Sequence, residues 1–188
     1  MIRVAIFASG TGSNARCLMQ HFKDHQDILV SMVASDKPNA GVLDIATSYE
    51  VPTYTFTKQE LREGNVEQDL KSKKVDFIIL AGFLALIPET LVQSYLHRII
   101  NIHPSLLPNY GGKGMFGQHV HKAVKQNQEN QSGMTIHLVN KEFDKGKVLF
   151  QATTTLNEED TAEQIQKKVL VLEHQFFAGV VESYIQSV

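Results

Sequence analysis

The sequence contains no tryptophan and a single cysteine, Cys17. One thiol cannot form an intramolecular disulfide, and no Cys/His spacing is typical of a zinc site, so the composition favours a reducing compartment. No apolar run approaches the roughly 20 residues that a membrane helix needs. The apolar N-terminal run, residues 2–8, is also too short for a signal peptide and indicates a buried first strand. We therefore expect a cytoplasmic protein with no membrane partner.

An excess of basic charge is also absent. Eighteen Lys and Arg residues face twenty Asp and Glu residues, which gives a net charge of -2. The densest basic group, Lys71, Lys73 and Lys74, is typical of a solvated helix end and is too small to bind a polyanion. We expect small-molecule substrates and no nucleic acid. A length of 188 residues suits one domain, residues 1–188, with a substantial core.

Short apolar runs alternate with amphipathic stretches through the first half of the chain. Apolar residues on both faces of a strand, with helices between strands, indicate a parallel sheet that is covered on both sides. The expected strands are residues 2–8, 28–34, 53–56, 77–81 and 99–102, and the expected helices are residues 14–23, 43–49, 58–71 and 88–95.

The second half has a different pattern. Residues 134–139 and 148–155 are close in sequence and are predicted to pair as antiparallel strands. Residues 161–185 are predicted to form a long helix, with Asp160 or Thr161 as its N-cap. The predicted fold class is α/β: an open, mostly parallel, Rossmann-like sheet with an antiparallel C-terminal edge and a long C-terminal helix.

A glycine-containing loop follows the first predicted strand. Glycines let the backbone approach a ligand, and amides at a helix N-terminus attract negative charge, so a phosphate site and a plain tight turn both fit this loop. An alternative is a dinucleotide site, because Gly10, Gly12 and Ala15 match the loose fingerprint and Asp36 ends the second strand. The loop reads Ser9, Gly10, Thr11, Gly12, Ser13 and Asn14.

Asn101 and His103 are two residues apart at the end of a buried strand, so their side chains share a face. Ligands of open α/β sheets bind beside the carboxyl ends of the strands, and Pro104 favours an end to pairing here. An amide donor can stabilise an oxyanion, and an imidazole moves protons near neutral pH. This pair therefore predicts an acyl-transfer site, although a single strand-end histidine is more often satisfied by backbone.

Residues 101–108, Asn-Ile-His-Pro-Ser-Leu-Leu-Pro, resemble the hallmark of the folate-dependent formyltransferases. The resemblance extends over nearly the whole chain. It includes the glycine loop and residues 80–83 (Leu-Ala-Gly-Phe), 133–137 (Gly-Met-Thr-Ile-His) and 144–148 (Asp-Lys-Gly-Lys-Val), together with Gln151. It implies the formyltransferase fold and transfer of a formyl group from 10-formyltetrahydrofolate to the amine of 5'-phosphoribosylglycinamide, without a metal. A monomer or a homodimer is compatible with it.

The resemblance also implies roles for individual residues. His103 would transfer protons and polarise the formyl group, Asn101 would hold the oxyanion, and Asp144 would pair with His103 and favour its charged form. The phosphorylated substrate would contact Gly10, Thr11, Gly12, Ser13, Asn14 and Pro104, with Glu173 on the ribose hydroxyls. The folate would contact Leu80, Phe83, Leu84, Ala85, Leu86, Ile87, Asn101, Val139, Asn140, Lys141, Glu142 and Asp144.

The sequence departs from the family pattern at three places. Ala85 replaces a basic side chain of several relatives, and Leu170 replaces a polar phosphate contact for which Lys167 or Lys168 can substitute. Residues 111–117 are rich in glycine, which suits either a lid or a surface loop. Other folate-formyl enzymes and a silent nucleotide-binding module stay open as alternatives.

Overall fold

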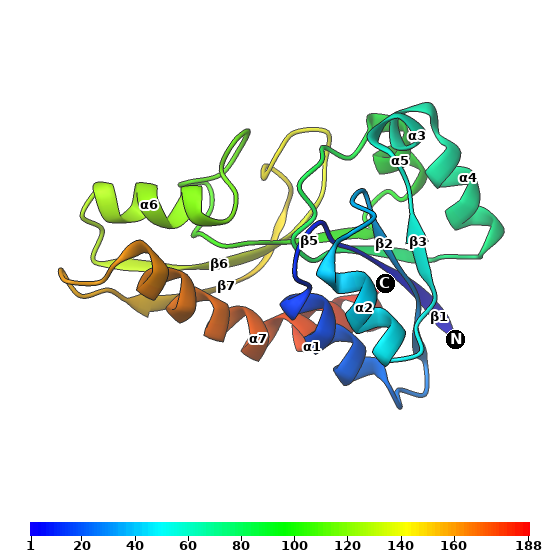
Figure 1. The fold of residues 1–188 in the computed structure, drawn as a ribbon, viewed down its shortest axis with the longest axis horizontal. Coiled ribbons are helices and arrows are strands. Elements are labelled where there is room, and N and C mark those ends of the chain that lie inside the picture. Colours follow the sequence, from blue (N-terminus) through cyan, green and yellow to red (C-terminus); the bar gives the residue numbers. More distant parts are fainter. The chain divides into compact units, whose positions relative to one another are not determined.

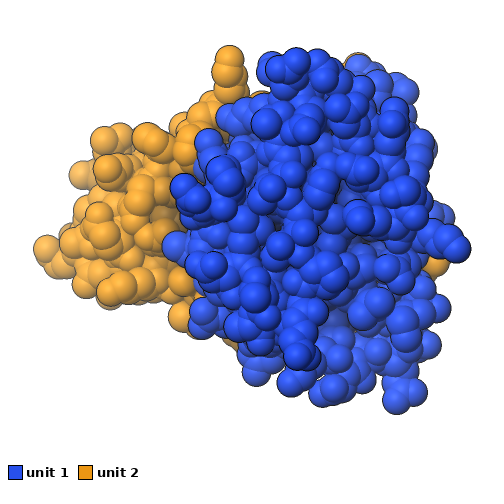
Figure 2. Space-filling view, turned by 45° about the vertical axis from the view of Figure 1, so that its right-hand side comes forward, with its two compact units in different colours: residues 1–101 blue, residues 102–188 orange.

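We describe residues 1–188 from a computed structural model. The chain divides into two compact units, residues 1–101 and residues 102–188 (Figure 2). The division falls inside the fifth strand. The single domain over residues 1–188 stays a prediction.

The first unit is built on a parallel sheet. Its strands are hydrogen-bonded in the order β3-β2-β1-β4-β5. All four residues of β4 and the last four of β1 are buried, which explains their continuous apolar runs. The strands are β1 (Ile2–Phe7), β2 (Ile28–Ser35), β3 (Thr53–Thr55), β4 (Phe77–Leu80) and β5 (Ile99–His103).

Five helices connect these strands. The prediction of one helix over residues 58–71 is wrong, because Gly64 adopts a left-handed conformation (φ 87°) that ends α3 and precedes α4. Thr57 and Glu60 form a capping box at the start of α3. The helices are α1 (Ser13–Phe22), α2 (Gly41–Ser48), α3 (Lys58–Glu63), α4 (Asn65–Ser72) and α5 (Glu89–Ser94).

Three phenylalanines form an aromatic cluster in the core of the first unit. The ring centroid of Phe7 lies 5.4 Å from that of Phe56 and 5.4 Å from that of Phe83. All three side chains are buried. The cluster anchors the segment after β4 to the end of β1, since Phe83 follows β4 and Phe7 ends β1.

The second unit contains α6 (Gln118–Gln126), β6 (Gln131–Leu138), β7 (Val148–Thr155) and α7 (Ala162–Gln186). Strands β6 and β7 pair antiparallel, with a register shift between Ile136 and His137. Helix α7 runs along this pair (Figure 1). Thr161 is its N-cap and forms a capping box with Gln164, so the second of the two predicted caps is observed.

The predicted fold class is confirmed. The full strand order is β3-β2-β1-β4-β5-β6-β7, and β5 contributes residues to both units. Helix α6 was not predicted from the sequence, although Val120 and Val124 have helical spacing and are both buried there.

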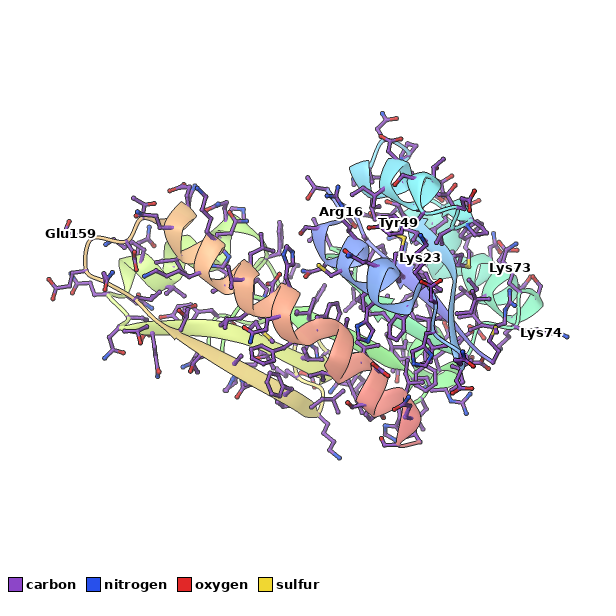
Figure 3. The ribbon with its side chains drawn as sticks, turned by 90° about the horizontal axis from the view of Figure 1, so that it is seen from below. Arg16, Lys23, Tyr49, Lys73, Lys74 and Glu159 are labelled. Atoms are coloured by element: carbon purple, nitrogen blue, oxygen red, sulfur yellow. The ribbon has the colours of Figure 1, made fainter.

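Two expectations from the composition concern the basic residues near residue 73 and the helices. Lys73 and Lys74 are exposed at the C-terminal end of α4 and point away from the first unit (Figure 3). None of the helices combines the length and the apolar character that crossing a bilayer requires.

Candidate active site

The end of β5 presents the two residues of the Asn-x-His pattern. Asn101 and His103 lie two residues apart on this strand, so their side chains leave the same face. Asn101 is partly buried, and His103 is 4% exposed. Pro104 has no N–H with which to continue the strand, and β5 ends at His103, one residue later than predicted.

His103 belongs to the second unit, and both of its ring nitrogens face groups of that same unit. Nε2 lies 2.8 Å from the carbonyl oxygen of Tyr110, and Nδ1 lies 3.4 Å from Oδ1 of Asp144. A carbonyl oxygen only accepts hydrogen bonds, so Nε2 carries a proton and donates it to Tyr110. The structure therefore pairs His103 with Asp144 through Nδ1.

The β6–β7 connection holds Asp144 in place. Asp144 itself is left-handed (φ 56°), a conformation that aspartate tolerates. A Cβ atom at Gly146 would lie 1.6 Å from the carbonyl oxygen of Leu138, so only glycine allows the chain to turn this tightly. On the other side, the Gly112 amide donates to Oδ2 of Asp144 at 2.9 Å.

His137 on β6 is a further member of this cluster. Its Nδ1 donates to the carbonyl oxygen of Leu138 at 2.8 Å, and its Nε2 lies 3.6 Å from Oδ1 of Asp144. The side chain is almost completely buried. In the sequence His137 is noted only as part of the family pattern over residues 133–137, because nothing in a strand pattern indicates which acid a histidine will meet.

Burial and neighbouring charges shift the pKa values of His103 and Asp144 in opposite directions. Burial lowers the pKa of His103 below its usual value, and this effect outweighs the opposing effect of the Asp144 carboxylate. Burial would raise the pKa of Asp144, but His137, His103 and the Gly112 amide together hold it below its usual value. Within this cluster the Asp144 carboxylate favours the charged form of His103, and burial favours the neutral form.

A buried hydrogen-bond network fixes the loop that follows His103. The Thr135 hydroxyl donates to the carbonyl oxygen of Ser105 at 2.6 Å and accepts from the Leu107 amide at 3.0 Å. Gln151 Nε2 donates to the Leu107 carbonyl oxygen at 3.0 Å and to the Thr135 hydroxyl at 2.8 Å. This network positions the segment that carries the Tyr110 carbonyl to His103.

The glycine loop lies in the first unit, between β1 and α1. Gly12 is left-handed (φ 83°), and a Cβ atom there would lie 2.6 Å from a methyl group of Val42. Packing alone therefore requires this glycine. Gly10 and Thr11 are exposed, and the partly buried Ser13 and Asn14 open α1. The amides at this helix start are suitably arranged for an anion.

Asp36 does not support the dinucleotide alternative. Its Oδ1 accepts a hydrogen bond of 2.6 Å from Ser9, and its Oδ2 is buried. Ser9 also accepts a hydrogen bond of 3.2 Å from the Leu84 amide. The carboxylate thus joins the glycine loop to the segment after β4, and it is not exposed for a ribose hydroxyl.

The segment after β4 mixes core and surface side chains. Leu80, Phe83 and Ile87 are buried, Ala85 is partly buried, and Leu84 and Leu86 are 46% and 47% exposed. In the second unit, Val139 and Asn140 are partly buried, whereas Lys141 and Glu142 are exposed. The exposed leucines are the members of this set that are most accessible to a ligand.

Helix α7 carries the remaining candidate. Glu173 is only 7% exposed, unlike an ordinary solvated helix acid. Lys168 is paired with Asp160 and also donates to the carbonyl oxygen of Thr155, so it is engaged within the protein; Lys167 is exposed. No group of three or more His, Cys, Asp or Glu side chains is arranged to hold a metal ion.

Comparison with known proteins extends these observations. Phosphoribosylglycinamide formyltransferase of Bacillus subtilis (strain 168) is 34% identical over 97% of this chain and 94% of its own length. The chloroplastic enzyme of that name from Arabidopsis thaliana is 39% identical over 95% of this chain, which spans 64% of that relative. The chain likewise spans 60% of the relative from Vigna unguiculata.

Solved structures show the same likeness. The crystal structure of phosphoribosylglycinamide formyltransferase from Anaplasma phagocytophilum matches with a TM-score of 0.90 and 33% identity, over 99% of this chain and 88% of that chain. The one from Bacillus halodurans matches with a TM-score of 0.87 and 35% identity, over 96% of this chain and 94% of that chain. The model of the family described as formyl transferase matches residues 2–181. On this evidence, the chain that carries His103 and Asp144 in this arrangement belongs to the formyl transferase family.

Proposed function

We propose that this protein transfers the formyl group of 10-formyltetrahydrofolate to the amine of 5'-phosphoribosylglycinamide. The products are the N-formyl compound and tetrahydrofolate, and the step belongs to de novo purine biosynthesis. Family membership and the names of the similar proteins support this proposal. The observation that carries it is the buried His103 held between the Tyr110 carbonyl and Asp144 at the end of β5.

The chemistry matches these side chains. The neutral amine attacks the formyl carbon, a C–N bond forms, and the carbonyl oxygen becomes an oxyanion. Asn101 would donate its amide N–H to that oxygen. His103 would give its Nε2 proton to the folate nitrogen as the old C–N bond breaks, and would take back at Nε2 the proton that the amine loses. Asp144 would orient the imidazole and stabilise its charged form.

The proposed binding residues fall into two sets, one for the phosphorylated substrate and one for the folate. The glycine loop, residues 10–14, would hold the phosphate through amides at the start of α1, because negative charge is favoured at a helix N-terminus. Pro104 and Glu173 complete the proposed contacts with the phosphorylated substrate, and the burial of Glu173 supports a specific role. The exposed Leu84 and Leu86 and the loop over residues 139–144 would contact the folate.

The partners and location are part of the same proposal. We infer that the protein acts on small molecules only, as a monomer or a homodimer, in the cytoplasm. The single cysteine and the lack of a basic cluster support this inference.

The direct test is formyl transfer from 10-formyltetrahydrofolate to 5'-phosphoribosylglycinamide, followed by the change in folate absorbance. His103→Ala should lower kcat by about 10² or more, with smaller effects on KM, because a positioned acid–base group is lost. Asn101→Ala should act similarly through loss of the oxyanion donor. His21→Ala, an exposed position on α1, is the matched control.

Near-normal turnover by the His103→Ala variant would refute the proposed centre. Formate release without formylated product would point instead to a folate hydrolase. Saturable micromolar binding of NAD would revive the dinucleotide alternative.

A further inference from the structure

Oδ1 of Asp144 faces two imidazole rings at once. It lies 3.4 Å from Nδ1 of His103 and 3.6 Å from Nε2 of His137. These side chains are 10%, 5% and 2% exposed, respectively, so bulk water does not screen the three groups. The other carboxylate oxygen, Oδ2, accepts the Gly112 amide, which leaves Oδ1 as the oxygen that meets both rings.

Backbone carbonyls fix the tautomer of each ring. Nε2 of His103 lies 2.8 Å from the Tyr110 carbonyl oxygen, and Nδ1 of His137 lies 2.8 Å from the Leu138 carbonyl oxygen. Each of these nitrogens must carry a proton, because a carbonyl oxygen can only accept. If both rings were neutral, the nitrogens that face Asp144 would be bare lone pairs.

Two bare lone pairs against an ionised carboxylate would repel it. No water can relieve this repulsion, because a bridging water needs about 5 Å between the outer atoms and only 3.4–3.6 Å is available. At least one additional proton must therefore lie within the cluster. Two additional protons would place two buried cations beside a single carboxylate, which is costly, so one proton is favoured.

A further titratable ring lies within reach of this cluster. His121 of α6 is 2% exposed, and its charge interaction is with His103. Burial, followed by the effect of His103, lowers the pKa of His121 to about 4, so this ring is neutral near neutral pH. It cannot supply the additional proton.

We propose that His137 is the second proton carrier of this site, sharing one proton with His103 across Oδ1 of Asp144. His137 is a positioning residue in this scheme, since it acts on the reaction through His103 and Asp144. The use of the shared proton in formyl transfer rests on the proposed function, whereas the sharing itself does not.

The shared proton balances the reaction. Formyl transfer forms one C–N bond and breaks another; the attacking amine loses one proton and the leaving folate nitrogen gains one. With the shared proton on its Nδ1, His103 can give its Nε2 proton to the leaving folate nitrogen and then take one back at Nε2 from the attacking amine. The cluster thus returns to its starting protonation state within each turnover, with no net exchange with solvent.

The first test is histidine ¹⁵N NMR of the unmodified protein without substrates. We expect His103 to carry its fixed proton on Nε2 and His137 on Nδ1, and one further proton to be divided between Nδ1 of His103 and Nε2 of His137. In the Asp144→Asn variant this division should be lost. A further proton held entirely by one of these two nitrogens, or a fixed proton on the opposite nitrogen of either ring, would overturn the proposal.

The second test separates proton transfer from structure. His137→Asn retains an N–H near the Leu138 carbonyl, and His137→Gln retains one near Asp144, but neither side chain titrates. Both variants should lower kcat about 10-fold with little change in KM, as loss of an auxiliary acid–base group does. In both, the limb of the kcat/KM profile that belongs to His103 should move to higher pH, because the charge on His137 lowers the pKa of His103.

Wild-type kcat and an unmoved limb in the His137→Asn variant would mean that His137 only supports the fold. His21→Gln on the surface of α1 is the control and should leave both quantities unchanged. The two proposals fail separately. A proton divided between the two rings without any formyl transfer would retain the shared proton and refute the proposed function, and transfer with the proton held by one ring alone would do the reverse.

Discussion

The Thr135 hydroxyl is the centre of the buried network behind the candidate site, and Thr135→Val removes it with little change in shape. Thr135 is fully buried on β6. Its hydroxyl makes three hydrogen bonds: one to the Ser105 carbonyl, one from the Leu107 amide and one from Gln151. Valine fills the same volume but cannot make any of them.

The expected loss in the free energy of unfolding depends on which hydrogen bonds the partners of the Thr135 hydroxyl keep. Gln151 still donates to the Leu107 carbonyl oxygen, so the loss there is small. The Leu107 amide loses the Thr135 hydroxyl as its acceptor, and an unsatisfied buried amide costs about 1–3 kcal/mol. The Ser105 carbonyl loses a donor, worth about 1 kcal/mol. We expect Thr135→Val to lower the free energy of unfolding by about 2–4 kcal/mol.

Urea unfolding measures this change as a lower midpoint at an unchanged slope. Thr135→Ser retains the hydroxyl and loses one methyl group, so it should cost only about 1 kcal/mol. Thr153→Val, at an exposed position of β7, should be nearly neutral. A loss below about 0.5 kcal/mol in the Thr135→Val variant would refute the accounting of the network.

The same substitution should reduce activity. The network holds the segment that brings the Tyr110 carbonyl to Nε2 of His103. Loosening this segment frees the imidazole to rotate, so we expect kcat to fall more than KM rises. Equal kcat in the Thr135→Val and Thr135→Ser variants would show that the network does not position His103.

Three further predictions concern other parts of the chain. Asp144→Asn should lower kcat by about 10². It should also move the His103 limb of the kcat/KM profile to lower pH, because the carboxylate of Asp144 raises the pKa of His103 and its removal lets that pKa fall. An unmoved limb contradicts the pairing of Asp144 with His103. Gly146→Ala should lower the melting temperature and kcat together, because its Cβ would overlap the Leu138 carbonyl oxygen; unchanged melting would refute that turn geometry. Ser13→Ala should raise KM for the phosphorylated substrate several-fold and leave KM for folate unchanged, and the reverse result would reassign the glycine loop.

Local sequence patterns were sufficient for most of the elements. Apolar runs of strand length alternate with amphipathic stretches. This pattern can be recognised from the sequence alone, because strands that bury both faces need continuous apolar runs. The end of β5 could be predicted to within one residue, since Pro104 cannot continue a hydrogen-bond ladder. The family resemblance of residues 101–108 likewise depends only on order along the chain. The break at Gly64 was missed because a single glycine within a helical pattern is usually tolerated.

Contacts between distant residues were decided only by the tertiary structure. The sequence contains His137 and Asp144 but cannot show that one carboxylate oxygen meets two rings, because that depends on the turn at Gly146. It cannot show that the Tyr110 carbonyl fixes the His103 tautomer, because that depends on the path of the intervening loop. The direction in which the pKa of His103 is shifted also depends on the fold. Burial lowers this pKa and the Asp144 carboxylate raises it, and only packing determines which effect is larger.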